Sequence, residues 1–189
     1  SFPWAQELWE REWTSNIMEV VRSQILEPRK ELSLRSHISS PTSIRDPVSQ
    51  LVRDQYEENP YPCWIKAGMG DKGESIGNVL RGPPLRLDLG NYNSPENPRI
   101  LVAGCGTGKH ALATASRFSN AHVLAVDLSL SSLSYALRKT KELKFSNIEY
   151  AQWDIMELGS LGRRFDLIEC GGVLHHLCDP LAGWWVLVD

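Results

Sequence analysis

Cysteine is scarce in this sequence, and the cysteines present form no pattern typical of a metal site or a disulfide framework. The 189-residue chain has four of them, Cys63, Cys105, Cys170 and Cys178, without a C-x-x-C pair. Structural zinc sites and small secreted proteins depend on closely paired or regularly spaced cysteines. The scattered thiols therefore argue against a bound metal and predict a reducing compartment, with the cytoplasm as the expected location.

The sequence also lacks a membrane span, a targeting segment and a broad basic face. No apolar run approaches the roughly 20 residues of a transmembrane helix, and the opening stretch SFPWAQELWERE is acidic and amphipathic, unlike a signal peptide. The formal net charge is −3 with both signs interspersed, whereas binding to nucleic-acid phosphates needs clustered positive charge. A soluble globular protein is expected, with neither a membrane nor a nucleic acid as its partner.

A helical N-terminal extension is predicted for residues 1–60. Apolar residues recur at helical spacing between residues 4 and 26, and Pro28 is expected to end this helix. The tryptophans at positions 4, 9 and 13 are expected to pack against the rest of the protein. The stretch PVSQLVRDQYEEN predicts a second, shorter helix.

Residues 61–98 are predicted to form a loop-rich connector, because prolines and glycines are frequent there. Three aromatic residues, Tyr56, Tyr61 and Trp64, precede the first predicted strand. Two interpretations stay open for them: ordinary packing, or a cover over the mouth of a ligand site.

Short aliphatic runs alternate with helical stretches in residues 99–189. The runs RILVAG, HVLAVD, NIEYAQWD and FDLIEC are typical of buried strands, and the stretches between them have helical spacing. Consecutive strand–helix–strand units build a parallel sheet with helices on both faces. The sequence therefore predicts an α/β fold for this part of the chain.

A glycine-rich turn, in ILVAGCGTGKH, follows the first predicted strand. In an open parallel sheet the ligand binds beyond the carboxyl ends of the strands, where glycines let backbone amides approach it. A phosphate-binding loop, G-x-x-x-x-G-K-S/T, is disfavoured, because Ala103 and His110 stand where a glycine and a hydroxyl belong. A dinucleotide fingerprint can be placed on GTGKHA, but it leaves Gly104 unexplained.

The turn resembles motif I of the class I S-adenosylmethionine-dependent methyltransferases, whose G-x-G-x-G loop wraps the methionine part of the cofactor. The match falls on Gly104, Gly106 and Gly108. Asp127, nineteen residues past Gly108, stands where this family has an acid that accepts hydrogen bonds from both ribose hydroxyls. Enzymes that use NAD also have an acid there, so Asp127 indicates a nucleoside without choosing between the cofactors.

Two later segments extend the resemblance. Asp154, in YAQWDIME, matches the acid that accepts from the adenine amino group, with Trp153 and Ile155 as its apolar neighbours. The segment RFDLIECGGVLHHLCDP resembles motif IV, in which a strand ends in small residues beside the methyl donor. The resemblance thus implies a Rossmann-like sheet and S-adenosylmethionine as the cofactor. It implies cofactor contacts from Gly104, Cys105, Gly106, Gly108, Asp127, Leu128, Asp154, Ile155 and Cys170.

The sequence departs from the family pattern at two places. Ala103 stands where many members have an acid that helps to orient the amino group of the cofactor. The D/N/S-P-P-Y/F/W motif of the enzymes that methylate amino groups of nucleic acids is absent after the fourth strand, which leads instead to VLHHL, common among small-molecule methyltransferases. A small-molecule acceptor is therefore expected.

A narrower resemblance covers SQLVRDQYEENPYPCW in the extension. This segment is similar to the one that precedes the methyltransferase domain in bacterial-type proteins that join it to tetratricopeptide repeats. The sequence contains no such repeat, so any repeats are expected elsewhere in the natural protein.

No catalytic residue is assigned from the sequence, because displacement at a sulfonium needs no protein nucleophile and positioning can supply much of the rate. His175 and His176 are adjacent, and adjacent helical side chains point about 100 degrees apart, so the two cannot easily share a metal. An S-adenosylmethionine-dependent methyltransferase is predicted. The alternatives are a non-catalytic interaction module with this fold and a NAD-dependent oxidoreductase.

The family's sheet has seven strands, whereas four aliphatic runs are found here, with PLAGWWVLVD expected as the helix after the fourth. We therefore expect residues 99–189 to be the cofactor-binding core truncated after strand four. On that expectation, this fragment alone would be inactive.

Overall fold

Four parallel strands form the centre of the molecule. The structure is a computed structural model, and it describes residue 8 and residues 11–68 and 73–189. The strands are β1 (Arg99–Ala103), β2 (His122–Asp127), β3 (Ile148–Gln152) and β4 (Leu167–Cys170), in the order β3-β2-β1-β4. All three strand pairs are parallel. The predicted α/β sheet and its four strands are confirmed.

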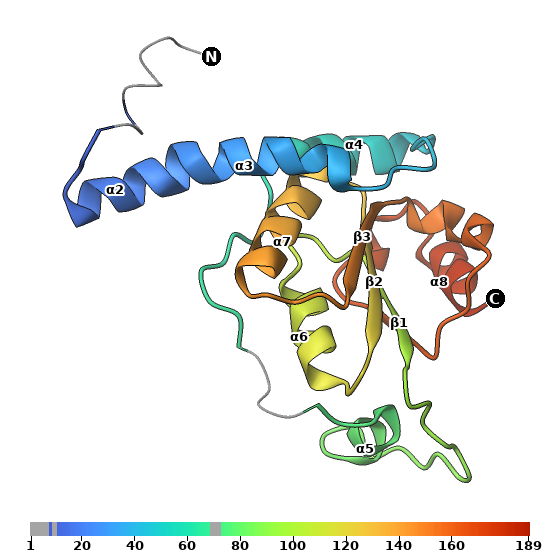
Figure 1. The fold of residues 1–189 in the computed structure, drawn as a ribbon. Helices are drawn as coiled ribbons and strands as arrows, with labels where there is room; N and C mark the ends of the chain where they lie inside the picture. The colour runs from blue at the N-terminus through green and yellow to red at the C-terminus, as the bar shows by residue number, and fades with distance from the viewer. Residues whose placement is uncertain (1–7, 9–10, 69–72) are drawn as a thin grey trace.

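Helices cover both faces of this sheet (Figure 1). On one face lie α6 (Lys109–Arg117) and α7 (Leu130–Glu142), and on the other lie α8 (Pro180–Val188) and the 3-10 helix η3 (Ile155–Leu161). Because successive side chains of a strand point to opposite faces of the sheet, β1 contributes residues to two apolar clusters. Ile100 and Val102 belong to the first, and Leu101 and Ala103 to the second. This double burial explains the continuous aliphatic runs of the sequence.

The N-terminal extension contains a long continuous helix that runs past Pro28. It consists of α2 (Ser15–Val21), the π-helical turn η1 (Arg22–Leu26), α3 (Glu27–Leu34) and the 3-10 turn η2 (Arg35–His37). The expected stop at Pro28 was wrong. The Glu27 N–H donates to the Arg22 carbonyl, five residues back, as in a π-helix. This wider turn ends just before Pro28, which has no N–H to donate. The chain then continues as α3.

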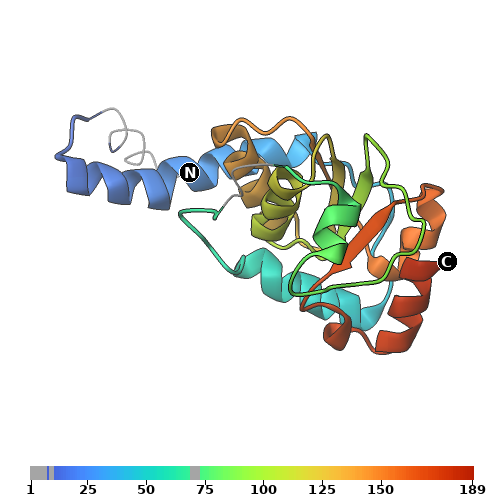
Figure 2. The same ribbon diagram turned by 90° about the horizontal axis from the view of Figure 1, so that it is seen from below.

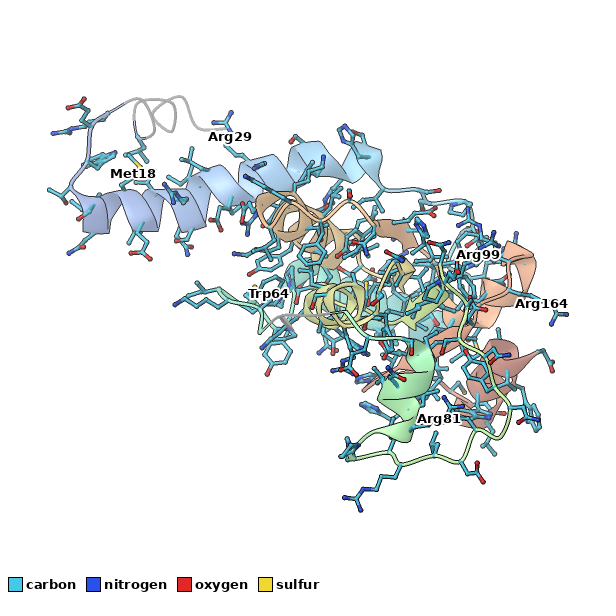
Figure 3. The ribbon with its side chains drawn as sticks, turned by 60° about the horizontal axis from the view of Figure 1, so that its bottom comes forward. Met18, Arg29, Trp64, Arg81, Arg99 and Arg164 are labelled. Carbon is cyan, nitrogen blue, oxygen red and sulfur yellow. The ribbon has the colours of Figure 1, made fainter. Side chains whose placement is uncertain are left out.

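The first turns of this helix lie away from the sheet, where Figure 1 places α2 and Figure 3 labels Met18. Trp13 contacts its own segment: its Nε1 donates to the Leu8 carbonyl at 2.5 Å, and the Arg11 guanidinium lies 4.7 Å from its ring. These contacts differ from the packing expected for the tryptophans. Trp4 and Trp9 lie outside the described residues.

The rest of the extension crosses the carboxyl ends of the strands. Ser39 pairs with Ala151, and its carbonyl accepts from the Gln152 N–H at 2.8 Å, at the end of β3. Helix α4 (Pro47–Glu58) follows, starting at Asp46, whose side chain accepts from the Ser49 N–H. The predicted second helix is thus confirmed. It contacts both α7 and the 3-10 turn η4 (Leu174–His176), beside which it lies in Figure 2.

The connector contains one short helix among its described residues, α5 (Ile76–Arg81), capped by Ser75. Ile76 is buried in the first apolar cluster, and Glu74 exchanges backbone hydrogen bonds with the end of α6. Trp64 lies where the connector meets the sheet domain, while Arg81 marks α5 (Figure 3). The connector is therefore less uniformly loop-like than expected.

Candidate functional site

A cavity of about 540 Å³ opens at the carboxyl ends of the strands, where open parallel sheets bind their ligands. Its walls come from the glycine turn after β1, from the segments after β2, β3 and β4, from α4, and from residues 61–62. Seven of the nine residues predicted to contact a cofactor line it: Gly104, Cys105, Gly106, Asp127, Leu128, Asp154 and Ile155.

The glycine turn is built from three left-handed residues, Gly104 at φ 72°, Gly106 at φ 52° and Gly108 at φ 81°. A Cβ on Gly104 would lie 2.2 Å from Cγ2 of Val173, so both the backbone and the packing require glycine there. At Gly106 the nearest atom to such a Cβ is the Tyr61 carbonyl oxygen at 3.5 Å. The turn therefore leaves its backbone open to the cavity at Gly106.

Gly108 and Cys170 do not line the cavity. A Cβ on Gly108 would lie 2.5 Å from Cβ of Ala136, so this glycine allows α6 to start close against α7. Cys170 ends β4 and packs against the second apolar cluster, and burial raises the pKa of its thiol. Cys105 does line the cavity, but burial raises the pKa of this thiol well above its ordinary value, which favours packing over nucleophilic chemistry.

Asp127 ties the end of β2 to the glycine turn. Its Oδ2 accepts from the Gly106 N–H at 2.7 Å, and its Oδ1 accepts from the Ser129 N–H at 3.0 Å. Burial raises the pKa of Asp127, and these two hydrogen bonds offset the rise only in part. Each carboxylate oxygen has a second lone pair, so Asp127 can also accept from a ligand in the cavity.

Asp154 lies at the end of β3 and is 1% exposed. Its Oδ1 accepts from the Met156 N–H at 3.0 Å, which makes Asp154 the cap of η3. The neighbouring Trp153 and Ile155 are buried and line the cavity with it. The arrangement combines a helix cap with an acid that faces the cavity between two apolar side chains.

The extension contributes a wall that the sequence does not predict. Ser49, Val52 and Tyr56 of α4 line the cavity, and the Tyr56 carbonyl accepts from the Ser129 hydroxyl at 3.0 Å. Their spacing of three and four residues gives one face of a helix, but the sequence does not say what that face meets.

The aromatic segment is fixed to the glycine turn by side-chain hydrogen bonds. Tyr61 and Pro62 line the cavity, and the Thr107 hydroxyl donates to the Pro62 carbonyl at 2.5 Å. Trp64 is buried, and its Nε1 donates to the Thr107 carbonyl at 3.0 Å. Tyr56 and Tyr61 therefore lie over the cavity, whereas Trp64 supports the turn from outside it.

A second polar group lies between α6 and β4. His110 lines the cavity, and its Nε2 lies 3.0 Å from Oε2 of Glu169; the Thr114 hydroxyl donates to the same oxygen. Burial alone would raise the pKa of Glu169, but the hydrogen bonds from His110 and Thr114 hold it below its ordinary value. No sequence pattern predicts this group, because the pairing depends on how α6 packs on β4.

Three polar atoms in residues that line the cavity have no hydrogen-bond partner within the described part of the chain. They are Oγ of Ser49, Oγ of Ser132 and Nε1 of Trp153. Buried polar groups are satisfied in most structures, so unpaired ones around one cavity favour a polar ligand. Among all the residues that the structure describes, no group of three or more His, Cys, Asp or Glu side chains could hold a metal ion.

Residues 100–183 match the family described as a methyltransferase domain. An uncharacterised protein of Synechococcus sp. is 32% identical over 152 residues, which are 79% of this chain and 36% of that protein. A ubiquinone biosynthesis O-methyltransferase of Actinobacillus pleuropneumoniae is 28% identical over 142 residues, 71% of this chain and 57% of the enzyme. The chain thus spans about a third of the first relative and less than two thirds of the second.

The solved structure of the [4+2]-cyclase SpnF covers 77% of this chain and 57% of its own, with a TM-score of 0.51 and 21% identity. The likeness shows the fold alone, and the cyclase name shows that this fold hosts more than one reaction. The sheet is the one predicted for a class I methyltransferase. Across the residues described, every helix is too short or too polar to span a membrane.

Proposed function

We propose that this chain binds S-adenosylmethionine in the cavity and transfers its methyl group to a small-molecule acceptor. The observation that carries the proposal is the convergence of Gly106, Asp127 and Asp154 on one cavity, each at the end of a different parallel strand. A match to a methyltransferase domain over residues 100–183 supports the reaction class.

The residues present fit this cofactor in their chemistry. The open backbone of Gly106 suits close approach by a ligand, and Asp127 has lone pairs for a diol. Asp154, buried between Trp153 and Ile155, suits an aromatic base that carries an amino group. The unpaired Ser49, Ser132 and Trp153 atoms offer further partners for a polar ligand.

S-adenosylmethionine, when bound, supplies a methyl group on a sulfonium, which leaves positioning as the main task of the protein. Residues of helix α4 and Tyr61 add to the walls of the cavity, and a walled site limits the access of water. Asp127 and the glycine turn hold each other through the Gly106 N–H, so the binding groups are ordered before a ligand arrives. Such preorganisation favours affinity.

The relatives differ in their acceptors: one from Clostridium novyi is named tRNA (guanine-N(7)-)-methyltransferase, whereas two others have names that fit a small acceptor, free or attached to a carrier. One relative, 33% identical over 111 residues, is named malonyl-[acyl-carrier protein] O-methyltransferase of Acetivibrio thermocellus, and the Actinobacillus relative is named for ubiquinone biosynthesis. The link to proteins with tetratricopeptide repeats rests on residues 49–64 alone, and a cytoplasmic location rests on the cysteine pattern. Both are part of the proposal.

Isothermal titration with S-adenosylmethionine, S-adenosylhomocysteine and NAD in parallel tests the proposal. We expect both adenosyl sulfur compounds to bind and NAD to give no heat of binding. Binding of NAD alone would favour an oxidoreductase. Binding of the donor without transfer to any acceptor would favour a non-catalytic module with this fold.

A further inference from the structure

His110 is anchored by a carboxylate that is itself anchored. Oε2 of Glu169 faces His110 Nε2 at 3.0 Å and also accepts from the Thr114 hydroxyl. The Glu169 side chain is 18% exposed, whereas that of His110 is 44% exposed and lines the cavity. The mostly buried carboxylate therefore fixes one side of the ring and leaves the other side accessible.

The hydrogen bond also selects the tautomer of His110. A carboxylate only accepts, so Nε2 carries the proton and Nδ1 keeps a free lone pair. Nδ1 lies on the side of Gly171, where an added Cβ would come within 4.0 Å of it. Gly171 follows β4 and lines the same cavity. The unprotonated nitrogen is thus directed to the part of the cavity beside the end of β4.

The other imidazole of the cavity lacks such an anchor. His176 lines the cavity, and its ring contacts are aromatic, with Tyr56 at 6.4 Å and His175 at 4.1 Å between centroids. Among the described residues, the ion pairs that involve a histidine join His110 to Glu169 alone. A base that becomes charged when it takes a proton is stabilised by a neighbouring carboxylate, and this favours His110.

We propose that His110 is the proton acceptor for a hydroxyl group of the methyl acceptor, with Glu169 and Thr114 as positioning residues. This proposal rests on the proposed function. In the step, the acceptor oxygen gives its proton to His110 Nδ1 and forms a bond to the methyl carbon. The carbon–sulfur bond of the sulfonium breaks, and its electron pair stays on sulfur. The products are the methyl ether, S-adenosylhomocysteine and an imidazolium paired with Glu169.

The acidity of the hydroxyl narrows the acceptor class. An ordinary imidazole has a pKa of about 6.5 and a phenol has a pKa of about 10. A base with a pKa near the operating pH can remove the phenol proton in the transition state, while the new bond forms. Val52, Tyr56 and Leu177 give the cavity apolar and aromatic walls, which suit a planar ring. The acceptor is therefore a phenol or an enol of similar acidity.

The experiment compares four forms of the natural protein that contains residues 1–189: the wild type, His110→Asn, Glu169→Gln and the control His122→Asn. His122 is exposed at the opposite end of β2. Each protein is titrated with S-adenosylhomocysteine, and formation of S-adenosylhomocysteine from the donor is then measured with catechol, 4-nitrophenol or aniline as the acceptor. The tautomer of His110 is read from nitrogen-15 spectra of histidine-labelled protein.

We expect the wild type and His122→Asn to methylate catechol or 4-nitrophenol. His110→Asn should lose on the order of 10²–10⁴-fold of the rate with S-adenosylhomocysteine affinity within about twofold of wild type, because His110 acts on the acceptor; that affinity also reports an intact fold. Glu169→Gln should lose less of the rate than His110→Asn, because a neutral amide stabilises the imidazolium less than a carboxylate does, and it should give a mixture of tautomers at His110.

Three results would overturn the inference. They are a His110→Asn rate near that of the wild type, a wild-type His110 protonated at Nδ1, and a wild type that binds S-adenosylhomocysteine but methylates neither phenol. Failure of the wild type to bind S-adenosylhomocysteine is a different outcome, because it overturns the proposed function itself.

Discussion

Asp127 shows how one residue serves the fold and the site together. Its two oxygens accept from two backbone N–H groups, that of Gly106 in the glycine turn and that of Ser129 after β2. A ligand diol would share these oxygens with the backbone. Replacing the side chain therefore removes a ligand contact and also releases the glycine turn.

We predict that Asp127→Ala weakens the binding of S-adenosylhomocysteine by about 1.5–3 kcal/mol, the magnitude of hydrogen bonds to a charged group. Asp127→Asn should lose less, because its remaining carbonyl oxygen can still accept from Gly106. Calorimetric titration of both variants measures the loss, with thermal unfolding as the control for the fold. An unchanged dissociation constant in Asp127→Ala would contradict the assignment of this residue.

The raised pKa of Asp127 predicts a pH dependence of binding. Ligand hydroxyls donate to the ionised form, so affinity should fall as the pH drops through the raised pKa, above the ordinary value of 3.8. The stability of the ligand-free protein should change with pH in the opposite direction. A carboxyl group whose pKa is raised in the folded state stabilises the fold at low pH, and this contribution is lost as the pH rises. Calorimetric titrations with S-adenosylhomocysteine at pH values around this raised pKa should show an affinity that changes with pH in the wild type. In Asp127→Asn the contribution of this group to the pH dependence should be absent.

At the scale of helices and strands, Arg138 connects the extension to the sheet domain. This side chain is 1% exposed and pairs with Glu27 at 3.0 Å and Glu31 at 2.8 Å on α3, and with Glu142 at 3.0 Å on its own helix α7. One buried cation thus faces three partly exposed carboxylates. Its removal leaves these charges without a partner at the contact between α3 and α7.

We predict that Arg138→Ala lowers the free energy of unfolding by about 3 kcal/mol, the low end for a broken buried pair, because the carboxylates can regain water. The matched control is Arg163→Ala, whose pair with Glu149 is about half exposed on both sides and should contribute less than about 1 kcal/mol. Urea unfolding of both variants gives the two values. Equal losses would mean that α3 does not depend on Arg138.

The elements also show what the sequence could predict. The four strands and the acids at their ends were predictable, because a buried parallel strand needs an aliphatic run and the next residue lies at the carboxyl edge. The course of the chain through Pro28 was not, since the π-helical turn that accommodates it depends on hydrogen bonding five residues apart. The roles of Ser49, Tyr56 and Glu169 were not predictable either, because each depends on which surface of a helix or strand meets another element.

For the whole molecule, the extension and the sheet domain share one cavity. Helix α4 and residues 61–62 line one side of it, and the glycine turn with Asp127 and Asp154 lines the other. Hydrogen bonds join the two sides, from Ser129 to Tyr56 and from Thr107 to Pro62. A ligand in the cavity would therefore contact both parts and stabilise them against each other.

This arrangement predicts the pattern of hydrogen exchange on binding. S-adenosylhomocysteine at 100 times its dissociation constant stabilises the bound state by about 2.7 kcal/mol. Amides that exchange through openings that release the ligand should therefore slow by about 100-fold. We expect this slowing in α4 and residues 61–64 as well as in residues 104–110. Helix α5 lies at the opposite end of the strands (Figure 1), so its amides should keep their exchange rates. Asp127→Ala at the same ligand concentration serves as the control and should show weaker protection throughout. Protection of the glycine turn with none in α4 would mean that the extension covers the cavity without contributing to the bound state.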